Sequence, residues 1–438
     1  MNKSNKNSLT SRLAILFIAV LAVFALYSSG AAAVAQQATP AATQSAAATA
    51  APTMQATQCA SVTDSTTTIN IGASVPITGK YAAGGVQIQD GYQLGVADVN
   101  AAGGVVINCV RMKLNLTILD DASDPTKTVQ NMETLYANNN IVAYLGGFGS
   151  DLHVAAAAIA EKNKTPYIGV AFALYGVHQQ GFKYLFSPFP KSPGIVKTSF
   201  DMLDSLSPKP TKVGIFAEKT DWGAEMDTLW AKEAQARGYQ LTTDQQYAPG
   251  ATDFSTMILQ AKNAGTEVVM MLPNPPDGIA IFKQMNQLAY TPKLTFVVRA
   301  ADGASWGKTL GKVGDDVLLM PGWNPAVKFS GVSDMVARFQ TQFNTPAQAT
   351  AGPAYAVIQI LVDSLQRAGS LDRDALRDAI AATNLTNTVI GSVSFNPDGT
   401  GKVINVVNQY QNGKQVLVWP SDQAVGSLVY PAPAFADR

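Results

Sequence analysis

The segment Ile69-Asn70-Ile71-Gly72-Ala73-Ser74-Val75 decides the fold. It is short and apolar on both faces of an extended chain, which is typical of a strand buried between helices in a parallel sheet. A glycine-containing turn follows it, and an amphipathic helix is expected over 87–100. The segment therefore predicts the first strand–turn–helix unit of an α/β fold.

The same unit repeats along the chain. Further buried strands are expected at 114–119, 142–145, 167–170, 213–216, 268–272 and 295–298. Helices are expected between them, for example over 125–138, 221–236 and 254–264. A strand that is followed by a turn and a helix favours parallel βαβ units with right-handed crossovers. The predicted fold class is α/β.

The alternation stops at Phe186-Ser187-Pro188-Phe189-Pro190-Lys191-Ser192-Pro193, where three prolines favour an extended connection. It stops again near 320–325; two helices (352–368 and 372–382) and a turn at 396–401 follow. A chain of 438 residues exceeds the roughly 250–300 residues that one core supports. We therefore expect two α/β lobes joined by more than one crossing, with a ligand cleft at the carboxyl ends of the strands.

The N-terminal segment resembles an export signal. Lys3, Lys6 and Arg12 precede an apolar run of 15 residues from Leu13 to Tyr27, and small residues follow. A bilayer-spanning helix needs about 20 apolar residues, so a cleaved signal is favoured over an uncleaved anchor, which stays open as the alternative. The expected location is the periplasm or the outer face of the cytoplasmic membrane.

These patterns predict a division of the whole chain. Residues 1–35 form the signal, and the Ala/Thr/Gln-rich stretch 36–66 forms a disordered tether, either a spacer or a segment without a role. Lobe 1 is expected to comprise 67–191 and 323–400. Lobe 2 is expected to comprise 192–322 and 401–420, and 421–438 form a C-terminal tail.

The chain has two cysteines, Cys59 and Cys109, which lie shortly before the first and the second strand. Neighbouring parallel strands begin at the same edge of a sheet, and an exported protein can form disulfides. A disulfide that pins the tether to the fold is therefore favoured over two free thiols.

Composition and motifs argue against catalysis and against nucleic acid. Lys+Arg and Asp+Glu both number 31, so no net charge attracts nucleic acid or anionic lipid. His153 and His178 are the only histidines, and neither lies in a cluster of metal-ligating residues. Gly147-Phe148-Gly149 lacks the third glycine of a dinucleotide site, and Ser150 is not in a Gly-x-Ser-x-Gly motif. We expect no cofactor, no metal, no catalytic residue and no enzymatic activity.

Several motifs occur in an informative order. They are Ile71-Gly72-Ala73-Ser74-Val75-Pro76-Ile77-Thr78-Gly79, Gly91, Asp98-Val99-Asn100-Ala101-Ala102-Gly103-Gly104, Asp120-Asp121-Ala122-Ser123-Asp124-Pro125, Asp221-Trp222-Gly223 and Thr252-Asp253-Phe254-Ser255. In this order the chain, over about residues 67–420, resembles the leucine/isoleucine/valine-binding protein family. The resemblance implies a type I periplasmic-binding fold with three crossings between its lobes. It also implies a solute-binding protein of an ABC importer of amino acids, amides or related solutes.

The resemblance also implies ligand-binding residues. In lobe 1, Ser150 retains the family's hydroxyl, whereas Phe172 and Ala173 depart from the family by a bulky apolar group and a lost hydroxyl. In lobe 2, Trp222 matches an aromatic residue that packs on the ligand, with an ordinary core tryptophan as the alternative. Asn274 lies in a stiff proline-rich loop after the next strand.

Tyr81 and Gly84 complete the predicted lobe 1 contacts. Gly84 and Gly85 either let the backbone approach a ligand or form only a tight strand-to-helix turn.

The charged residue that follows the last strand bears on the solute. Amino-acid binders of the family place a carboxylate there, and this chain has Arg299, with Asp302 three residues later. An Arg299 that faces the cleft favours an organic acid, because guanidinium pairs with carboxylates. If Arg299 pairs with a local carboxylate instead, Asp302 faces the ligand. Both arrangements stay open.

These observations predict a monomeric, non-catalytic protein that closes around a small polar solute, whether amino acid, amide or organic acid. Its expected partners are that solute and the permease subunits of an ABC importer, and no nucleic acid. A ligand-sensing receptor component of the same fold, which signals to a membrane partner, is the alternative.

Overall fold

The structure, a computed structural model, describes residues 59–438. The predicted export signal (1–35) and residues 36–58 of the predicted tether lie outside the described residues. Within residues 59–438, no helix has both the length and the apolar character that a membrane span requires.

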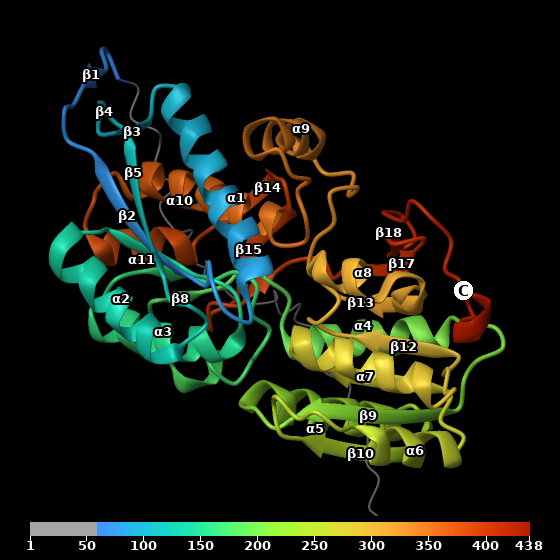
Figure 1. Cartoon of the computed structure of the whole chain (residues 1–438). Coiled ribbons are helices and arrows are strands. Elements are labelled where there is room, and N and C mark those ends of the chain that lie inside the picture. Colours follow the sequence, from blue (N-terminus) through green and yellow to red (C-terminus); the bar gives the residue numbers. More distant parts are fainter. Residues whose placement is uncertain (1–58) are drawn as a thin grey trace, which may run out of the picture. The chain divides into compact units, whose positions relative to one another are not determined.

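Lobe 1 is built around a five-stranded parallel sheet of order β5-β2-β6-β7-β8 (Figure 1). Its strands are β2 (Ile69–Val75), β5 (Leu114–Asp120), β6 (Ala143–Leu145), β7 (Tyr167–Ile168) and β8 (Leu185–Phe186). Its helices are α1 (Ala82–Ala101), α2 (Pro125–Asn139), α3 (Ser150–Lys162), α9 (Val332–Phe343), α10 (Ala351–Ala368) and α11 (Arg373–Ala381). Three of these helices come from much later in the chain than the sheet.

Strand β2 is buried on both faces, as its composition predicts. Ile71 and Val75 belong to the core that contains the inner faces of α1 and α10. Gly72 points to the opposite face, where a side chain at this position would lie 2.9 Å from Leu135 of α2. Helices thus cover both faces of the sheet, and the apolar run of β2 is the consequence.

Lobe 2 is built around a seven-stranded sheet of order β10-β9-β11-β12-β13-β17-β18. Its strands are β9 (Lys212–Glu218), β10 (Gln240–Tyr247), β11 (Val268–Leu272), β12 (Leu294–Val297), β13 (Val317–Leu319), β17 (Val407–Gln411) and β18 (Lys414–Trp419). Its helices are α4 (Ser192–Asp204), α5 (Asp221–Ala236), α6 (Ser255–Asn263), α7 (Pro275–Gln287) and α8 (Ser305–Leu310). The first five strands are parallel, and β17 and β18 are antiparallel additions.

The chain passes between the lobes three times. It leaves lobe 1 after β8, returns after β13 to form α9, α10 and α11, and leaves again between β16 and β17. The start of the first crossing is hydrogen-bonded to the segment just before the third, because Ser187 N donates to Gly399 O and Gly401 N donates to Ser187 O. The predicted α/β class, two lobes and three crossings are confirmed.

The first crossing explains how a proline-rich segment precedes a helix. Residues 187–191 form no regular strand or helix, and α4 begins directly after them at Ser192. Pro193 lies in the first turn of α4, where the missing backbone N–H costs no hydrogen bond.

Two small sheets were not anticipated. One joins β1 (Thr63–Asp64), β4 (Val110–Met112) and β3 (Val105–Ile107), and the other joins β14 (Asn384–Thr388), β15 (Gly391–Phe395) and β16 (Gly401–Lys402). Strands β16 and β17 are separated by only four residues, yet they belong to different sheets.

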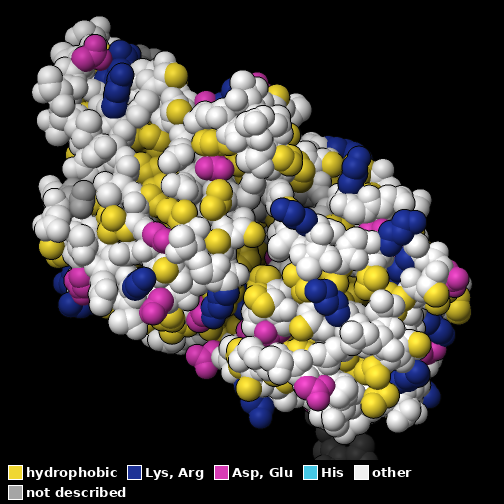
Figure 2. Space-filling view, in the orientation of Figure 1, with side chains coloured by type: hydrophobic (Ala, Val, Ile, Leu, Met, Phe, Trp, Pro, Cys, Tyr) yellow, Lys and Arg dark blue, Asp and Glu magenta, His cyan; other side chains and the backbone are white. Residues whose placement is uncertain are grey.

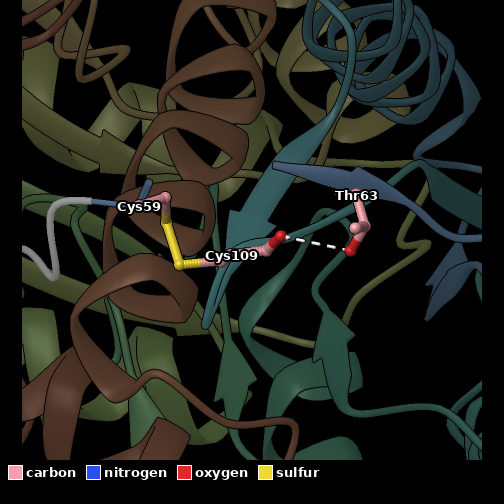
Figure 3. The surroundings of a disulfide bond; sticks show 3 residues. All are labelled: Cys59, Thr63 and Cys109. Atoms are coloured by element: carbon pink, nitrogen blue, oxygen red, sulfur yellow. Dashed lines mark hydrogen bonds between the residues drawn. A yellow bond between two sulfur atoms is a disulfide. The ribbon is translucent and has the colours of Figure 1, made fainter. Parts of the chain in front are cut away.

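The end of the predicted tether is folded, which corrects its boundary at residue 66. Thr63 and Asp64 form β1, which pairs in parallel with β4. A disulfide joins Cys59 to Cys109, and the Thr63 hydroxyl donates to the carbonyl of Cys109 (Figure 3). The backbone N–H of Thr63 donates to the same carbonyl. Backbone pairing to β4 and the disulfide therefore hold a segment whose composition alone cannot form a core.

Charge is spread over the surface. Figure 2 shows Lys and Arg interspersed with Asp and Glu over the described residues of this face, without a continuous patch of one sign. The view agrees with the balanced composition.

Removing the disulfide tests how much it stabilises the fold. Its cysteines are 50 residues apart, so the link restricts the unfolded chain across β2 and α1. We expect Cys59→Ala/Cys109→Ala to lower the free energy of unfolding by about 2–4 kcal/mol, measured by urea denaturation. Reductant should destabilise the natural chain and leave the double variant unchanged. Equal stabilities of the two proteins without reductant would contradict the expectation.

Candidate functional site

The predicted ligand-binding residues follow the carboxyl ends of parallel strands in both lobes. Tyr81 follows β2 and Ser150 follows β6 in lobe 1. Trp222, Asn274 and Arg299 follow β9, β11 and β12 in lobe 2. This edge of a parallel sheet is where α/β proteins bind ligands.

Within residues 59–438, Arg299 borders three cavities that contain residues of both lobes. Cavity A is lined by Tyr81, Ser150, Asp151, Val154, Leu174, Glu218, Thr220, Asp221, Trp222 and Arg299. Cavity B includes Tyr81, Gly84, Phe148, Arg299, Asp302 and Thr350. Cavity C includes Phe148, Phe172, Ala173, Trp222, Arg299 and Asp302. Arg299 is the point at which they meet.

The Arg299 guanidinium is bound from both lobes. Its Nη2 lies 2.5 Å from Oε1 of Glu218, and its Nε donates to the carbonyl of Pro273 at 3.3 Å. Its Nη1 donates to the Tyr81 hydroxyl of lobe 1 at 3.4 Å. The guanidinium carbon lies 5.7 Å from the Tyr81 ring centre and 5.2 Å from that of Trp222. The cation thus has aromatic rings of both lobes beside it.

The environment keeps Arg299 charged. Burial by itself lowers the pKa of the guanidinium, but Tyr81 and Glu218 outweigh burial and the pKa is raised above its usual value. The backbone of Arg299 has a φ of +76°, a left-handed conformation that is unfavourable for a bulky residue. The ion pair and the hydrogen bonds hold this strained position, and such strain concentrates at functional sites.

Asp302 provides a carboxylate without a full set of partners. Its Oδ1 is buried and accepts no hydrogen bond from the described residues. Burial raises the pKa of Asp302 to about 8, although the nearby Arg299 opposes the rise. Asp302 borders cavities B and C together with Arg299. A buried carboxyl of this kind binds an amine that reaches it.

The two arrangements that the sequence left open are combined. Arg299 pairs with a local carboxylate, Glu218, and it also borders cavities A, B and C. Asp302 borders two of the same cavities. The result is a guanidinium and a buried carboxyl at neighbouring positions of the same two cavities.

Trp222 is held by the first residue of α4. Its indole N–H donates to the Ser192 hydroxyl at 3.0 Å, and this hydroxyl donates to the Ala173 carbonyl at 2.9 Å. Trp222 also borders cavities A and C, so it combines a structural contact with a position at the candidate site. Ser192 thereby connects the lobe 1 loop at Ala173 to an aromatic ring of lobe 2.

Ser150 and Gly84, which were predicted to contact the ligand from lobe 1, lie at different cavities. Ser150 begins α3 and borders cavity A, with its Oγ 3.4 Å from the Leu174 N–H. Gly84 borders cavity B, but a side chain there would lie 2.5 Å from the Phe148 ring, and one at Gly85 would lie 1.9 Å from the Pro76 carbonyl. The close packing within lobe 1 is enough to explain both glycines.

The Phe172 ring lies in the interior of lobe 1, although the residue borders cavity C. The ring stacks on His153 at 4.2 Å and on His178 at 5.6 Å between centres. Lys191 Nζ lies 3.3 Å from its centre. Burial lowers the pKa of each histidine to about 3, so both imidazoles are neutral. We therefore assign the ring to the core and not to the ligand.

Asn274 caps helix α7. Its Oδ1 accepts from the backbone N–H of Asp277 at 3.1 Å, and its amide donates to the Asp277 carboxylate at 2.6 Å. Among the described residues that line cavities A, B and C, Asn274 is not present. The capping role explains the residue, which the sequence placed at the ligand because of its position after a strand.

Glu218 was missed by the sequence interpretation. It is the last residue of β9, and its side chain is 3% exposed beside Arg299. A glutamate that ends a run of six buried strand residues was the available signal, since a buried charge requires a partner. Among residues 59–438, no group of three or more His, Cys, Asp or Glu could hold a metal ion.

Comparisons with known proteins identify what the chain resembles. The family model described as periplasmic binding protein matches residues 68–413. The chain is 23% identical over 385 residues to Leu/Ile/Val-binding protein homolog 7 of Brucella abortus, which covers 83% of this chain and 94% of that protein.

Solved structures share the fold. A leucine binding protein, LivK, from Thermotoga maritima matches with a TM-score of 0.73 and 21% identity, over 80% of this chain and 97% of that chain. A solute binding protein from R. palustris in complex with benzoate matches with a TM-score of 0.70 and 18% identity, over 84% and 98%. The fold is thus the two-lobed type I periplasmic-binding fold that the sequence predicted.

Changing Asn274 separates capping from ligand binding. We expect Asn274→Ala to lower the free energy of unfolding by about 1 kcal/mol, because α7 loses its N-cap. Asn274→Ser should retain most of the stability, since serine also caps helices. Neither variant should alter the affinity for a bound solute. Thermal denaturation and calorimetry check both expectations, and a loss of affinity in Asn274→Ser at full stability would contradict the assignment.

Proposed function

Because this chain belongs to the periplasmic binding protein family, we propose that it is an exported protein that captures a small zwitterionic solute of the amino-acid class between its lobes. It then delivers this solute to the membrane subunits of an ABC importer. Membership of the family identifies the chain as a binding protein and not an enzyme. The observation that carries the proposal is the presence of Arg299 and Asp302 at the same two cavities.

Arg299 supplies the positive side of the site. A guanidinium has five N–H donors, and three contacts engage it, from Glu218, Pro273 and Tyr81. Donors are therefore left that a solute carboxylate can accept from. The Ser150 hydroxyl, on cavity A with Arg299, adds a donor from lobe 1.

Asp302 supplies the negative side. Its Oδ1 has no partner among the described residues, and a protonated amine of the solute satisfies it. A solute that carries a carboxylate and an amine can bind Arg299 and Asp302 at the same time. A simple organic acid can bind only Arg299, and it brings its negative charge close to Glu218 and Asp302.

The relatives support the class of solute but do not choose one member. The Brucella relative is named for leucine, isoleucine and valine, and the Thermotoga neighbour is a leucine binding protein. The R. palustris neighbour holds benzoate, an acid without an amine. Since the fold accepts both kinds of ligand, we base the choice on the charged groups of this chain.

The proposed mechanism is closure of the lobes on the solute. Tyr81 and Ser150 come from lobe 1, and Trp222, Arg299 and Asp302 come from lobe 2. A solute that touches both sets binds the closed arrangement more tightly than the open one, so it shifts the population toward closure. The permease subunits would recognise the closed form.

Calorimetry with matched solutes tests the proposal. We expect binding to alanine, leucine or phenylalanine and at least about tenfold weaker binding to propionate, 4-methylpentanoate or 3-phenylpropanoate, which lack only the amine, because a charged hydrogen bond is lost. Asp302→Asn should weaken binding to the amino acid by a similar factor. Binding to none of the amino acids, or tighter binding to the acids, would overturn the proposal.

The affinity for an amino acid should depend on pH through Asp302. At pH 6 this carboxyl, with a pKa of about 8, is protonated in the free protein, and an ammonium group must displace its proton. Affinity should therefore rise by up to about tenfold per pH unit from pH 6 and level off near pH 8. Proton release should be detectable by calorimetry in buffers of different ionisation enthalpy. The Asp302→Asn variant should lose the dependence, and an affinity that falls as pH rises would contradict it.

A further inference from the structure

We propose that Glu218 determines the charge class of the solute by neutralising Arg299, so that the site accepts a solute with an amine and rejects its amine-free acid. The inference rests on the proposed function and assigns a specificity-determining role to a residue outside the predicted ligand set. Its basis is the ion pair between Glu218 and Arg299 at the wall of cavity A.

The pair is buried and tightly made. The Glu218 and Arg299 side chains are 3% and 5% exposed, and Oε1 lies 2.5 Å from Nη2. Oε1 also accepts from the Thr220 hydroxyl at 3.2 Å, and Oε2 accepts from the Asn274 backbone N–H at 3.1 Å. Three contacts, from residues that follow β9, β11 and β12, fix the carboxylate beside the guanidinium.

Neutralisation changes what the arginine can attract. Away from water, a lone guanidinium strongly favours an anion, because the interaction of charges grows as the effective dielectric falls. With Glu218 beside it, the pair has no net charge, and Arg299 offers only hydrogen-bond donors to a solute carboxylate. Lys80 also lines cavity B, but it is paired with Asp151, so Asp302 is the ionisable group at cavities B and C that has no ion-pair partner in the described part of the chain, and it favours an amine.

The other carboxylates at cavity A are not equivalent to Glu218. Asp151 pairs with Lys80 at 3.2 Å, and both side chains are partly exposed to water. Asp221 is exposed at the start of α5. Lys80 compensates the charge of Asp151 and water screens that of Asp221, whereas the buried Glu218 acts on Arg299 with little screening.

The substitution Glu218→Gln tests the inference. The amide keeps the shape and an oxygen for the Asn274 N–H, but it removes the charge. We expect the affinity for propionate, 4-methylpentanoate or 3-phenylpropanoate, relative to that for alanine, leucine or phenylalanine, to rise at least about tenfold. A general loss of stability would weaken both members of a pair alike, so the ratio reports on charge selection.

A matched control removes a carboxylate from an ion pair elsewhere. Glu233 on α5 pairs with Arg237 at 2.7 Å, away from the three cavities. Glu233→Gln should leave the ratio of acid to amino acid affinity unchanged. The double variant Glu218→Gln/Arg299→Gln should lose the gain in acid binding, because no guanidinium is then left to attract the acid.

A reciprocal measurement remains decisive if Glu218→Gln does not fold. In Arg299→Gln the buried Glu218 is left alone, so the affinity for ethylamine, 3-methylbutylamine or 2-phenylethylamine relative to the matching amino acid should rise at least about tenfold. The double variant should lose this gain. If the natural chain binds amino acids but the affinity ratio is unchanged in Glu218→Gln, the proposed role of Glu218 is wrong. The same holds for an unchanged ratio in Arg299→Gln if only that variant folds. A natural chain that binds no member of the panel overturns the proposed function itself.

Discussion

The candidate site depends on one buried cation. Arg299 lies between two lobes, with its charge compensated by a single carboxylate at 2.5 Å and its backbone in a left-handed conformation. Leaving such a cation without its partner would cost about 3–5 kcal/mol, a large part of the stability of a protein. Glu218, the Pro273 carbonyl and the end of β12 must therefore keep their relative positions. The three cavities around the guanidinium are consequences of this arrangement.

Parallel topology makes the arrangement possible. The two residues of the ion pair are 81 positions apart in sequence, yet β9 and β12 both pair with β11, so their carboxyl ends lie close together. Tyr81 reaches the same guanidinium from the end of β2 in lobe 1. Short strands with apolar residues on both faces thus bring polar groups together at one edge, although no short motif in the sequence contains them all.

The sequence was sufficient for most of the apolar parallel strands and for several of the amphipathic helices between them. Strands such as β2 and β11 were predicted because their runs are apolar throughout. Strand β10 was missed because its sequence is largely polar, as an edge strand with few buried positions allows. The antiparallel strands of lobe 2 depend on a return of the chain that local patterns do not encode. For the same reason the end of the tether was judged unfolded, whereas its pairing with β4 holds it.

At the site, the position after a strand was predictable and the direction of each side chain was not. Asn274 and Arg299 occupy equivalent positions after neighbouring strands, but Asn274 caps a helix and Arg299 borders cavities A, B and C. Phe172 was expected at the ligand, yet two neutral imidazoles and a lysine surround its ring. Glu218 was overlooked because its partner is distant in sequence. These roles depend on which side chains pair across the fold, and the composition and spacing of the sequence do not predict such pairs.

The unequal strength of the Arg299 contacts bears on how the lobes can work. The bond to Glu218, within lobe 2, is short and joins opposite charges, whereas the bond to the Tyr81 hydroxyl of lobe 1 is 3.4 Å long and has a neutral acceptor. A charged pair at 2.5 Å is much stronger than a neutral contact near the limit of hydrogen bonding. Separating the lobes at this point therefore breaks the weaker contact and leaves the ion pair intact. Because the direct contact between the lobes is weak at this point, a solute that contacts both lobes can supply the free-energy difference that favours the closed arrangement.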